Sequence, residues 1–312
     1  MPAPLNTFAY SVLINLQRRI HDHTRQIAKD MGHDDGEPDG SLWVTDYNYL
    51  AIAPIRHGLH VEYFGDCSCE EPWEWTLQCL AQQEVANDIE SLAFSGPDEG
   101  ANGMREVNLT YLAEANISFP KLRSLFIRPT APSDHNLSQV RRDDEPFKDG
   151  GIIARLAEKM PYLVELTLPN APDAAFFDVP LPHLWTLRIG GAVDTQNFIE
   201  NMANSSNMPK LGTLDFTESS ELQSRWADKR APSSITPFAV FEHFLRSRAC
   251  DSLHTLCLRN TALNVAELQA LKALRPKLQL MVIQATRGGY VSHFEKNYFP
   301  WKHLVQPDPG LR

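Results

Sequence analysis

The sequence lacks any run of about 18 apolar residues, so it predicts no membrane-spanning helix. Its first residues, Met1 to Asn6, lack the basic stretch followed by an apolar block that marks a secretory signal. Cysteine is scarce, and its positions form no regular framework: Cys67, Cys69, Cys79, Cys250 and Cys257. We therefore expect a cytoplasmic chain whose five cysteines are all reduced.

Motifs of the common catalytic and cofactor-binding sites are also missing. The chain contains no G-x-S-x-G, H-E-x-x-H, G-x-x-x-x-G-K-S/T or G-x-G-x-x-G. We therefore expect no cofactor and a non-enzymatic protein. Convergent active sites need no such motif, so the alternative is an enzyme with an unrecognised site in the N-terminal region, built from Asp46, His57 and His60.

Candidate metal ligands have the wrong spacing. His21 and His23 lie two residues apart on an expected helix, where their side chains diverge. Only Ser68 separates Cys67 from Cys69, whereas zinc sites usually have two residues between cysteines and a second such pair. The sequence therefore predicts no metal site.

Positive charge is in deficit, with 29 Lys and Arg against 39 Asp and Glu and a formal net charge of −10. A negative protein repels nucleic acid phosphates and anionic membrane surfaces. We therefore expect neither of these as a partner, and the net charge favours a basic protein partner.

What the sequence does contain is one recurring six-residue pattern, L-x-x-L-x-L with conservative apolar replacements. It occurs at residues 89–94, 122–127, 163–168, 184–189, 211–216 and 253–258, with a looser copy at 278–282. The last two apolar residues alternate with period 2, so both point to one face of a short strand. A strand of this kind cannot bury that face alone. The pattern therefore predicts adjacent parallel strands with their central leucines buried: Leu92, Leu125, Leu166, Leu187, Leu214 and Leu256.

Helical segments separate the predicted strands. Apolar residues follow helical spacing in 151–160, 197–202, 238–245 and 265–274. A proline stands two residues before the first leucine of several copies, at Pro120, Pro161, Pro182 and Pro209. Since proline cannot continue a helix, it ends each returning helix at the same place.

This organisation resembles the leucine-rich repeat family over roughly residues 59–283. The best match is 253–263, which fits L-x-x-L-x-L-x-x-N/C-x-L with Thr261 at the Asn/Cys position. The other copies have Thr130, Ala171, Ala192 and Ser219 there, and the repeats are unevenly spaced, so the resemblance is to a degenerate member with insertions. It implies an α/β solenoid with a parallel concave sheet and convex helices. The alternative is an ordinary α/β domain whose parallel strands look alike.

The two ends of the chain differ from the repeats. Residues 1–75 predict an α+β N-terminal cap, with a helix over 8–31 and strands near 42–47, 49–53 and 59–64. A helix over 73–86 follows. We expect the leucine-rich-repeat-like solenoid to span 76–287, and 288–312 to be an aromatic C-terminal cap or tail.

The predicted function is protein–protein interaction through the concave sheet and the loops beside it. An inhibitor or immunity-type role would fit, and so would an adaptor. Two insertions, 128–150 and 217–237, both follow a repeat strand and are expected along one edge of the sheet. Arginines and aromatics are enriched where interfaces bind tightly. The predicted binding residues are Arg123, Phe126, Arg128, Glu165, Trp185, Arg188, Asp215, His254 and Arg259, with Arg142, Arg225 and Trp226 in the insertions.

Overall fold

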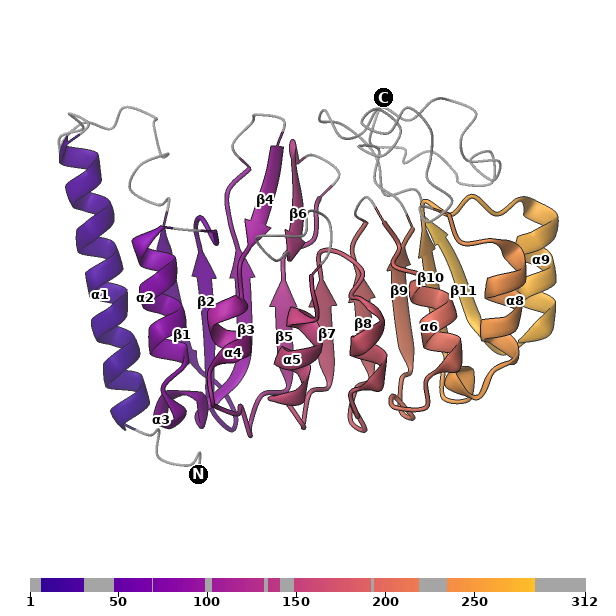
Figure 1. Ribbon diagram of the computed structural model, residues 1–312, viewed down its shortest axis with the longest axis horizontal. Coiled ribbons are helices and arrows are strands. Elements are labelled where there is room, and N and C mark those ends of the chain that lie inside the picture. The colour runs from indigo at the N-terminus through magenta and orange to yellow at the C-terminus, as the bar shows by residue number, and fades with distance from the viewer. Residues whose placement is uncertain are drawn as a thin grey trace.

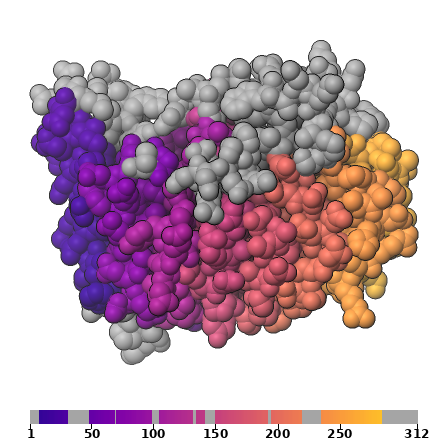
Figure 2. Space-filling model, in the orientation of Figure 1, coloured from indigo at the N-terminus to yellow at the C-terminus, as the bar shows by residue number. Residues whose placement is uncertain are grey.

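The computed structural model describes residues 7–30, 48–68, 70–98, 103–131, 134–140, 149–191, 194–218 and 235–283. They form a mixed α/β structure around a nine-stranded, mostly parallel sheet, whose strands follow one another along the long axis of the molecule (Figure 1). The helices lie on one face of this sheet. Figure 2 shows that helix-covered face in space-filling form.

The strands of the large sheet are ordered β1-β2-β3-β5-β7-β8-β9-β10-β11. Every neighbouring pair is parallel except β1 and β2, which are antiparallel. Their bounds are β1 Tyr49–Pro54, β2 Leu59–Phe64, β3 Ile89–Ser95, β5 Ser124–Ile127, β7 Glu165–Leu168, β8 Thr186–Ile189, β9 Thr213–Thr217, β10 Thr255–Arg259 and β11 Gln279–Ile283.

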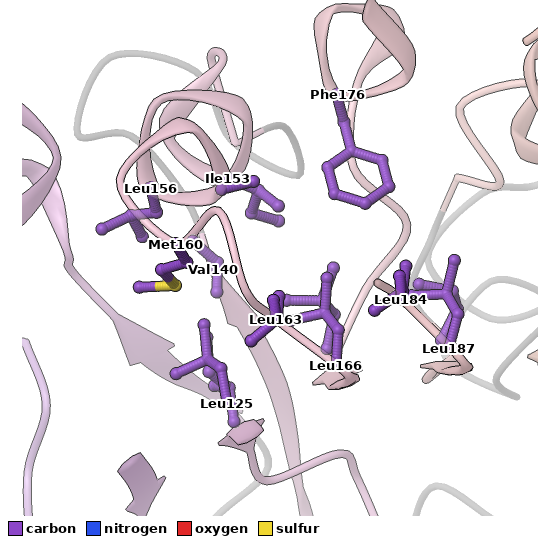
Figure 3. Close-up of a cluster of buried hydrophobic side chains, with 14 of the residues drawn as sticks. Leu125, Val140, Ile153, Leu156, Met160, Leu163, Leu166, Phe176, Leu184 and Leu187 are labelled. Carbon is purple, nitrogen blue, oxygen red and sulfur yellow. The ribbon is translucent and has the colours of Figure 1, made fainter. Parts of the chain in front are cut away.

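The repeat leucines align across this sheet. The register pairs Leu92, Leu125, Leu166, Leu187, Leu214 and Leu256 in one continuous row, which ends at Leu280 of the looser copy. All six central leucines are at most 4% exposed. The prediction of adjacent parallel strands with buried central leucines is confirmed. In Figure 3, Ile153 and Leu156 of α5 lie on the side of Leu125 and Leu166, and Phe176 lies above Leu184 and Leu187.

The helices supply the other half of this core. Their bounds are α1 Thr7–Asp30, α2 Glu71–Leu80, α3 Gln83–Ala86, α4 Thr110–Glu114, α5 Ile152–Glu158, α6 Phe198–Asn204, α8 Phe238–Arg246 and α9 Val265–Leu274, with short 3-10 turns η1 Ala174–Asp178 and η3 Arg248–Cys250. The helices expected over 8–31, 151–160, 197–202, 238–245 and 265–274 are present. The single helix expected over 73–86 is instead divided into α2 and α3, because Gln82 adopts an extended conformation between them.

A second, two-stranded parallel sheet was not predicted. β4 (Gly103–Val107) pairs with β6 (Asn136–Val140), and β6 lies inside the first insertion. The two strands stand beyond the carboxyl ends of β3 and β5 (Figure 1). This insertion is therefore partly regular structure rather than a simple loop.

Buried polar side chains close the carboxyl ends of the strands, one position earlier than the sequence pattern indicated. Asn170, directly before Ala171, accepts from the backbone N–H of Val140 at 2.8 Å and donates to its carbonyl at 3.2 Å. Glu218 accepts from the backbone N–H groups of Thr236 and Ala262. These side chains satisfy backbone groups of the segments beside them.

The cap boundaries remain predictions. The boundary at 75/76 falls inside α2, and β1 and β2 belong to the same sheet as the repeat strands. The C-terminal segment 288–312 lies outside the described residues, as do all of 31–47, with the strand expected near 42–47, and most of the second insertion. No helix in the described part of the chain has the length and apolar character needed to cross a bilayer.

Four of the five cysteines are described, and all four are free and buried: Cys67, Cys79, Cys250 and Cys257. Burial raises the pKa of each thiol, to about 11 for Cys79. Cys69 lies outside the described residues. The reduced state of all five cysteines stays a prediction.

Candidate binding surface

The sheet face opposite the helices carries the side chains that alternate with the buried leucines. Those in the repeat strands are half-exposed in most positions. Within the described residues, no helix packs on this face, which we call the open face. Its middle row, read from the register, runs Glu62, Ala93, Phe126, Thr167, Arg188, Asp215, Cys257 and Met281.

Three of the predicted binding residues meet in and beside this row. Arg259 holds Asp215 through two hydrogen bonds, Nε to Oδ1 at 2.6 Å and Nη2 to Oδ2 at 2.8 Å. Arg188 approaches the same carboxylate, with Nε 3.9 Å from Oδ2. The hydrogen bonds that Arg259 donates to Asp215 raise the pKa of its guanidinium. The guanidinium of Arg259 is therefore largely occupied by its bonds to Asp215. The Arg188 side chain is 43% exposed and can contact a partner.

Cys257, in the same row, is only 4% exposed. Burial, together with the charge of Asp215, raises the pKa of its thiol to about 11. It is thus a packed, protonated side chain beneath the charged cluster. Phe126, by contrast, is half-buried on β5 between Ala93 and Thr167, and Glu165 is exposed on β7.

Arg128 turns away from the open face toward the carboxyl edge of the sheet. Its Nη2 donates to Asp134 Oδ1 at 2.9 Å and its Nη1 to the Gly96 carbonyl at 2.8 Å. The same carboxylate accepts from Arg105 Nη1 at 3.2 Å, and Arg105 also donates to Ser138 Oγ. Since both guanidinium groups anchor the small sheet, Arg128 has a structural role there.

A cavity of about 120 Å³ adjoins this cluster, lined by Asp66, Cys67, Arg105, Glu106 and neighbouring residues. It is small, and two acids line it beside the single arginine. Asp66 already accepts from the Ser68 N–H and hydroxyl. The cavity suits a bound water better than a substrate of any size.

The amino edge of the sheet, where the parallel strands begin, brings the remaining predicted residues together with others that sequence reasoning missed. Trp185 is 46% exposed, and its ring lies 5.7 Å from that of His254. Tyr162, 45% exposed, lies 5.5 Å from the His183 ring, and the Arg123 guanidinium lies 5.7 Å from the Tyr162 centroid. Tyr162 and His183 could have been found from the sequence, because each stands between a proline and a repeat leucine.

Arg142, Arg225 and Trp226 lie outside the described residues, so their place beside the sheet stays a prediction. The proposed enzyme site is only partly described, since Asp46 is also outside. The His57 backbone N–H donates to Glu90, while His60 Nδ1 lies 2.9 Å from Ser91 Oγ and its Nε2 lies 3.9 Å from Glu62. Neither histidine lines the cavity described above.

Metal ligands do not gather in the part of the chain that the structure describes: no group of three His, Cys, Asp or Glu side chains there could hold an ion. Comparison of the chain with models of known protein families finds no match, and a search of curated proteins finds none either.

Proposed function

We propose that this chain is a non-enzymatic, leucine-rich-repeat-like solenoid that binds a protein partner through its open face and amino edge. The observation that supports this best is the open face itself. It is a broad sheet surface with an arginine–aspartate cluster and, at its edge, two pairs of neighbouring aromatic rings, Tyr162 with His183 and Trp185 with His254. Arginine and aromatic side chains of this kind supply most of the energy of tight protein interfaces.

The repeat character draws support from how the units are joined. Each repeat strand pairs only with its neighbours, and each central leucine meets the next one in register. Cytoplasmic location and an inhibitor-type, immunity-type or adaptor role follow as part of the proposal, because an acidic interaction protein with reduced cysteines suits them. The net charge of −10 continues to favour a partner that is basic overall.

The test is affinity capture with the full chain from native lysate, followed by affinity measurements on the captured protein. Arg188→Ala should lower affinity at least about tenfold without changing the melting temperature. Glu158→Lys, exposed on α5 on the helix-covered face, serves as the matched control and should bind like wild type. Loss of binding in the helix-face variant alone would place the site elsewhere.

A second candidate, an enzyme, has one observation in its favour: the hydrogen-bonded pair of Ser91 and His60. A serine next to a histidine is the start of a nucleophilic site. The acid that would orient the histidine is poorly placed, because Glu62 lies 3.9 Å from the His60 imidazole, beyond hydrogen-bonding distance. A fluorophosphonate probe should leave Ser91 unlabelled. Labelling of Ser91 that His60→Ala abolishes would favour the enzyme instead.

A further inference from the structure

The amino edge of the sheet repeats one residue class at one position. The residue between the proline and the first repeat leucine is basic or aromatic in five units: Lys121, Tyr162, His183, Lys210 and Lys277. The strands that follow are parallel and adjacent from β5 to β9, and β10, whose unit has Ser252 at this position, separates β9 from β11, so these five side chains line the same edge. All are exposed except His183, which is half-buried. The row is therefore available to a partner.

A second row stands two residues further along each unit. Arg123, Val164, Trp185, Gly212 and His254 occupy this position before β5, β7, β8, β9 and β10. A Cβ at Gly212 would lie 2.5 Å from Cζ2 of Trp185, so the indole lies directly over this residue. Only glycine leaves that space open. The Trp185 ring can therefore extend across β9 and approach His254, at 5.7 Å between centroids.

Some cations of this edge have structural partners. Lys121 pairs with Asp88 at 2.7 Å, the Lys159 ammonium binds the Ala115 carbonyl at 2.5 Å, and Arg275 binds the Leu245 carbonyl at 2.8 Å. Asp88 offsets the charge of Lys121, and the carbonyl contacts hold the charged ends of Lys159 and Arg275 against the fold.

Three other cations have no ion-pair partner within the described residues: Arg123, Lys210 and Lys277. Arg123 contacts the Tyr162 ring, and Glu165 is the exposed acid in the adjoining strand position. The acids of the amino edge are Asp88, Glu90, Glu165 and Asp251, of which Asp88 and Asp251 pair with Lys121 and Arg275. Its cations, Lys121, Arg123, Lys159, Lys210, Arg275 and Lys277, outnumber these acids, so in a chain with net charge −10 this edge is a locally positive, aromatic strip.

We propose that this strip binds an extended acidic segment of the partner protein, with carboxylates at Arg123 and Lys210 and an apolar side chain on Trp185. This rests on the proposed function and adds the chemistry of what the edge recognises. From β5 to β10 is four strand spacings, roughly 19 Å at about 4.8 Å each. An extended chain covers that length with about six residues.

Single-stranded nucleic acid is the other class of ligand that combines cations with stacking rings. The structure favours the peptide, because a nucleic acid strand carries a phosphate at every residue and its affinity depends on neutralising many of them. Three unpaired cations on an otherwise acidic protein would neutralise few. A short acidic peptide needs only two or three charge contacts.

The experiment is selection from a displayed library of random twelve-residue peptides against the full chain, with affinities then measured on the selected peptides. We expect enrichment of Asp and Glu over Lys and Arg. Trp185→Ala and Lys210→Glu should each lower affinity at least about tenfold. Gly212→Ala should lower it as well, although it removes no contacting group, because the new methyl displaces the indole. Arg246→Glu, exposed on α8, is the charge-matched control and should bind normally.

Circular dichroism melting of each variant confirms that the fold is intact. Enrichment of basic peptides, no enrichment, or selected peptides that bind Trp185→Ala normally would overturn the proposal. So would a fluorescein-labelled oligothymidine that binds as tightly as the peptides and depends on the same residues. If a captured lysate partner needs Arg188 but none of the edge residues, the acidic-segment proposal fails while protein binding through the open face stands.

Discussion

At the scale of single residues, the stability of the fold depends on the buried repeat leucines. Leu187 is fully buried in β8, between Leu166 and Leu214 in the aligned row. Leu187→Ala should lower the free energy of unfolding by about 2–5 kcal/mol, because it removes buried methyl groups and leaves a cavity in a packed core. Urea unfolding of the variant measures this. Thr186→Ala, half-exposed on the same strand, is the control and should unfold like wild type; equal stability of the two variants would contradict the role of the row.

Asp149 gives a residue-scale prediction on pH. The carboxylate is fully buried and accepts from the backbone N–H groups of Ile153 and Asp173, both at 3.0 Å. Burial, and next the charge of Asp173, raise its pKa from 3.8 to about 6. The folded state therefore holds this proton more tightly than the unfolded chain. The stabilisation that this proton contributes is complete below about pH 4. About 3 kcal/mol of it is lost as the pH rises through about 6.

Asp149→Asn keeps the size of the side chain and cannot ionise. The variant should therefore become more stable relative to wild type as the pH increases from about 4 to about 7. Denaturant titrations of both proteins across that range measure it. A difference that does not change with pH would show that the raised pKa does not govern stability.

At the scale of elements, the sequence predicted the repeat strands and most helices because their apolar periodicity is local. The small sheet of β4 and β6 could not be predicted in this way. Arg105 in β4 looks like a surface residue in the sequence, yet it is only 9% exposed. Its burial depends on Asp134 and Ser138, which lie 29 and 33 residues away. Because these partners are distant in the sequence, no local sequence pattern indicates that Arg105 is buried.

The candidate surface was predictable to a similar degree. Strand alternation located Arg188 and Asp215 on the open face and Trp185 and His254 near its edge. It could not show that Arg128 turns toward Asp134, since that carboxylate arrives with the first insertion. Nor could it show the stacking of Trp185, which requires the space over Gly212 in the next unit. Strand alternation determines the face to which a side chain points, whereas tertiary neighbours determine its partners.

A substitution of Asn170 tests which contacts hold the two-stranded sheet of β4 and β6 in place. It is 1% exposed and forms both hydrogen bonds with the Val140 backbone at the end of β6. Asn170→Ala leaves those two buried groups without a partner and should cost about 1–3 kcal/mol. Hydrogen exchange of the Val140 amide should accelerate. Asn204→Ala, at the exposed end of α6, is the matched control; unchanged exchange at Val140 in the Asn170 variant would show that β6 is held by other contacts.

At the scale of the whole molecule, contacts join neighbours along one direction. β10 packs on β9 and β11, α8 packs on α6 and α9, and no strand of the large sheet pairs beyond its immediate neighbours. In a linear array of this kind, stability is close to a sum of unit terms and nearest-neighbour terms, so the ends can open without the middle. An ordinary globular domain of the same size instead tends to unfold as one cooperative unit.

Leu271 tests which description holds. It is fully buried on α9, in the last described unit. Leu271→Ala should increase hydrogen exchange in α9 and β11 and leave β2 and β3, at the other end of the sheet, as protected as in wild type. Leu187→Ala, in the middle of the row, should affect both of its neighbours, β7 and β9. Mass spectrometry of exchanged peptides resolves these regions. If Leu271→Ala increased exchange equally in β2 and in β11, the chain would behave as a single cooperative domain, and the solenoid description would lose its main thermodynamic consequence.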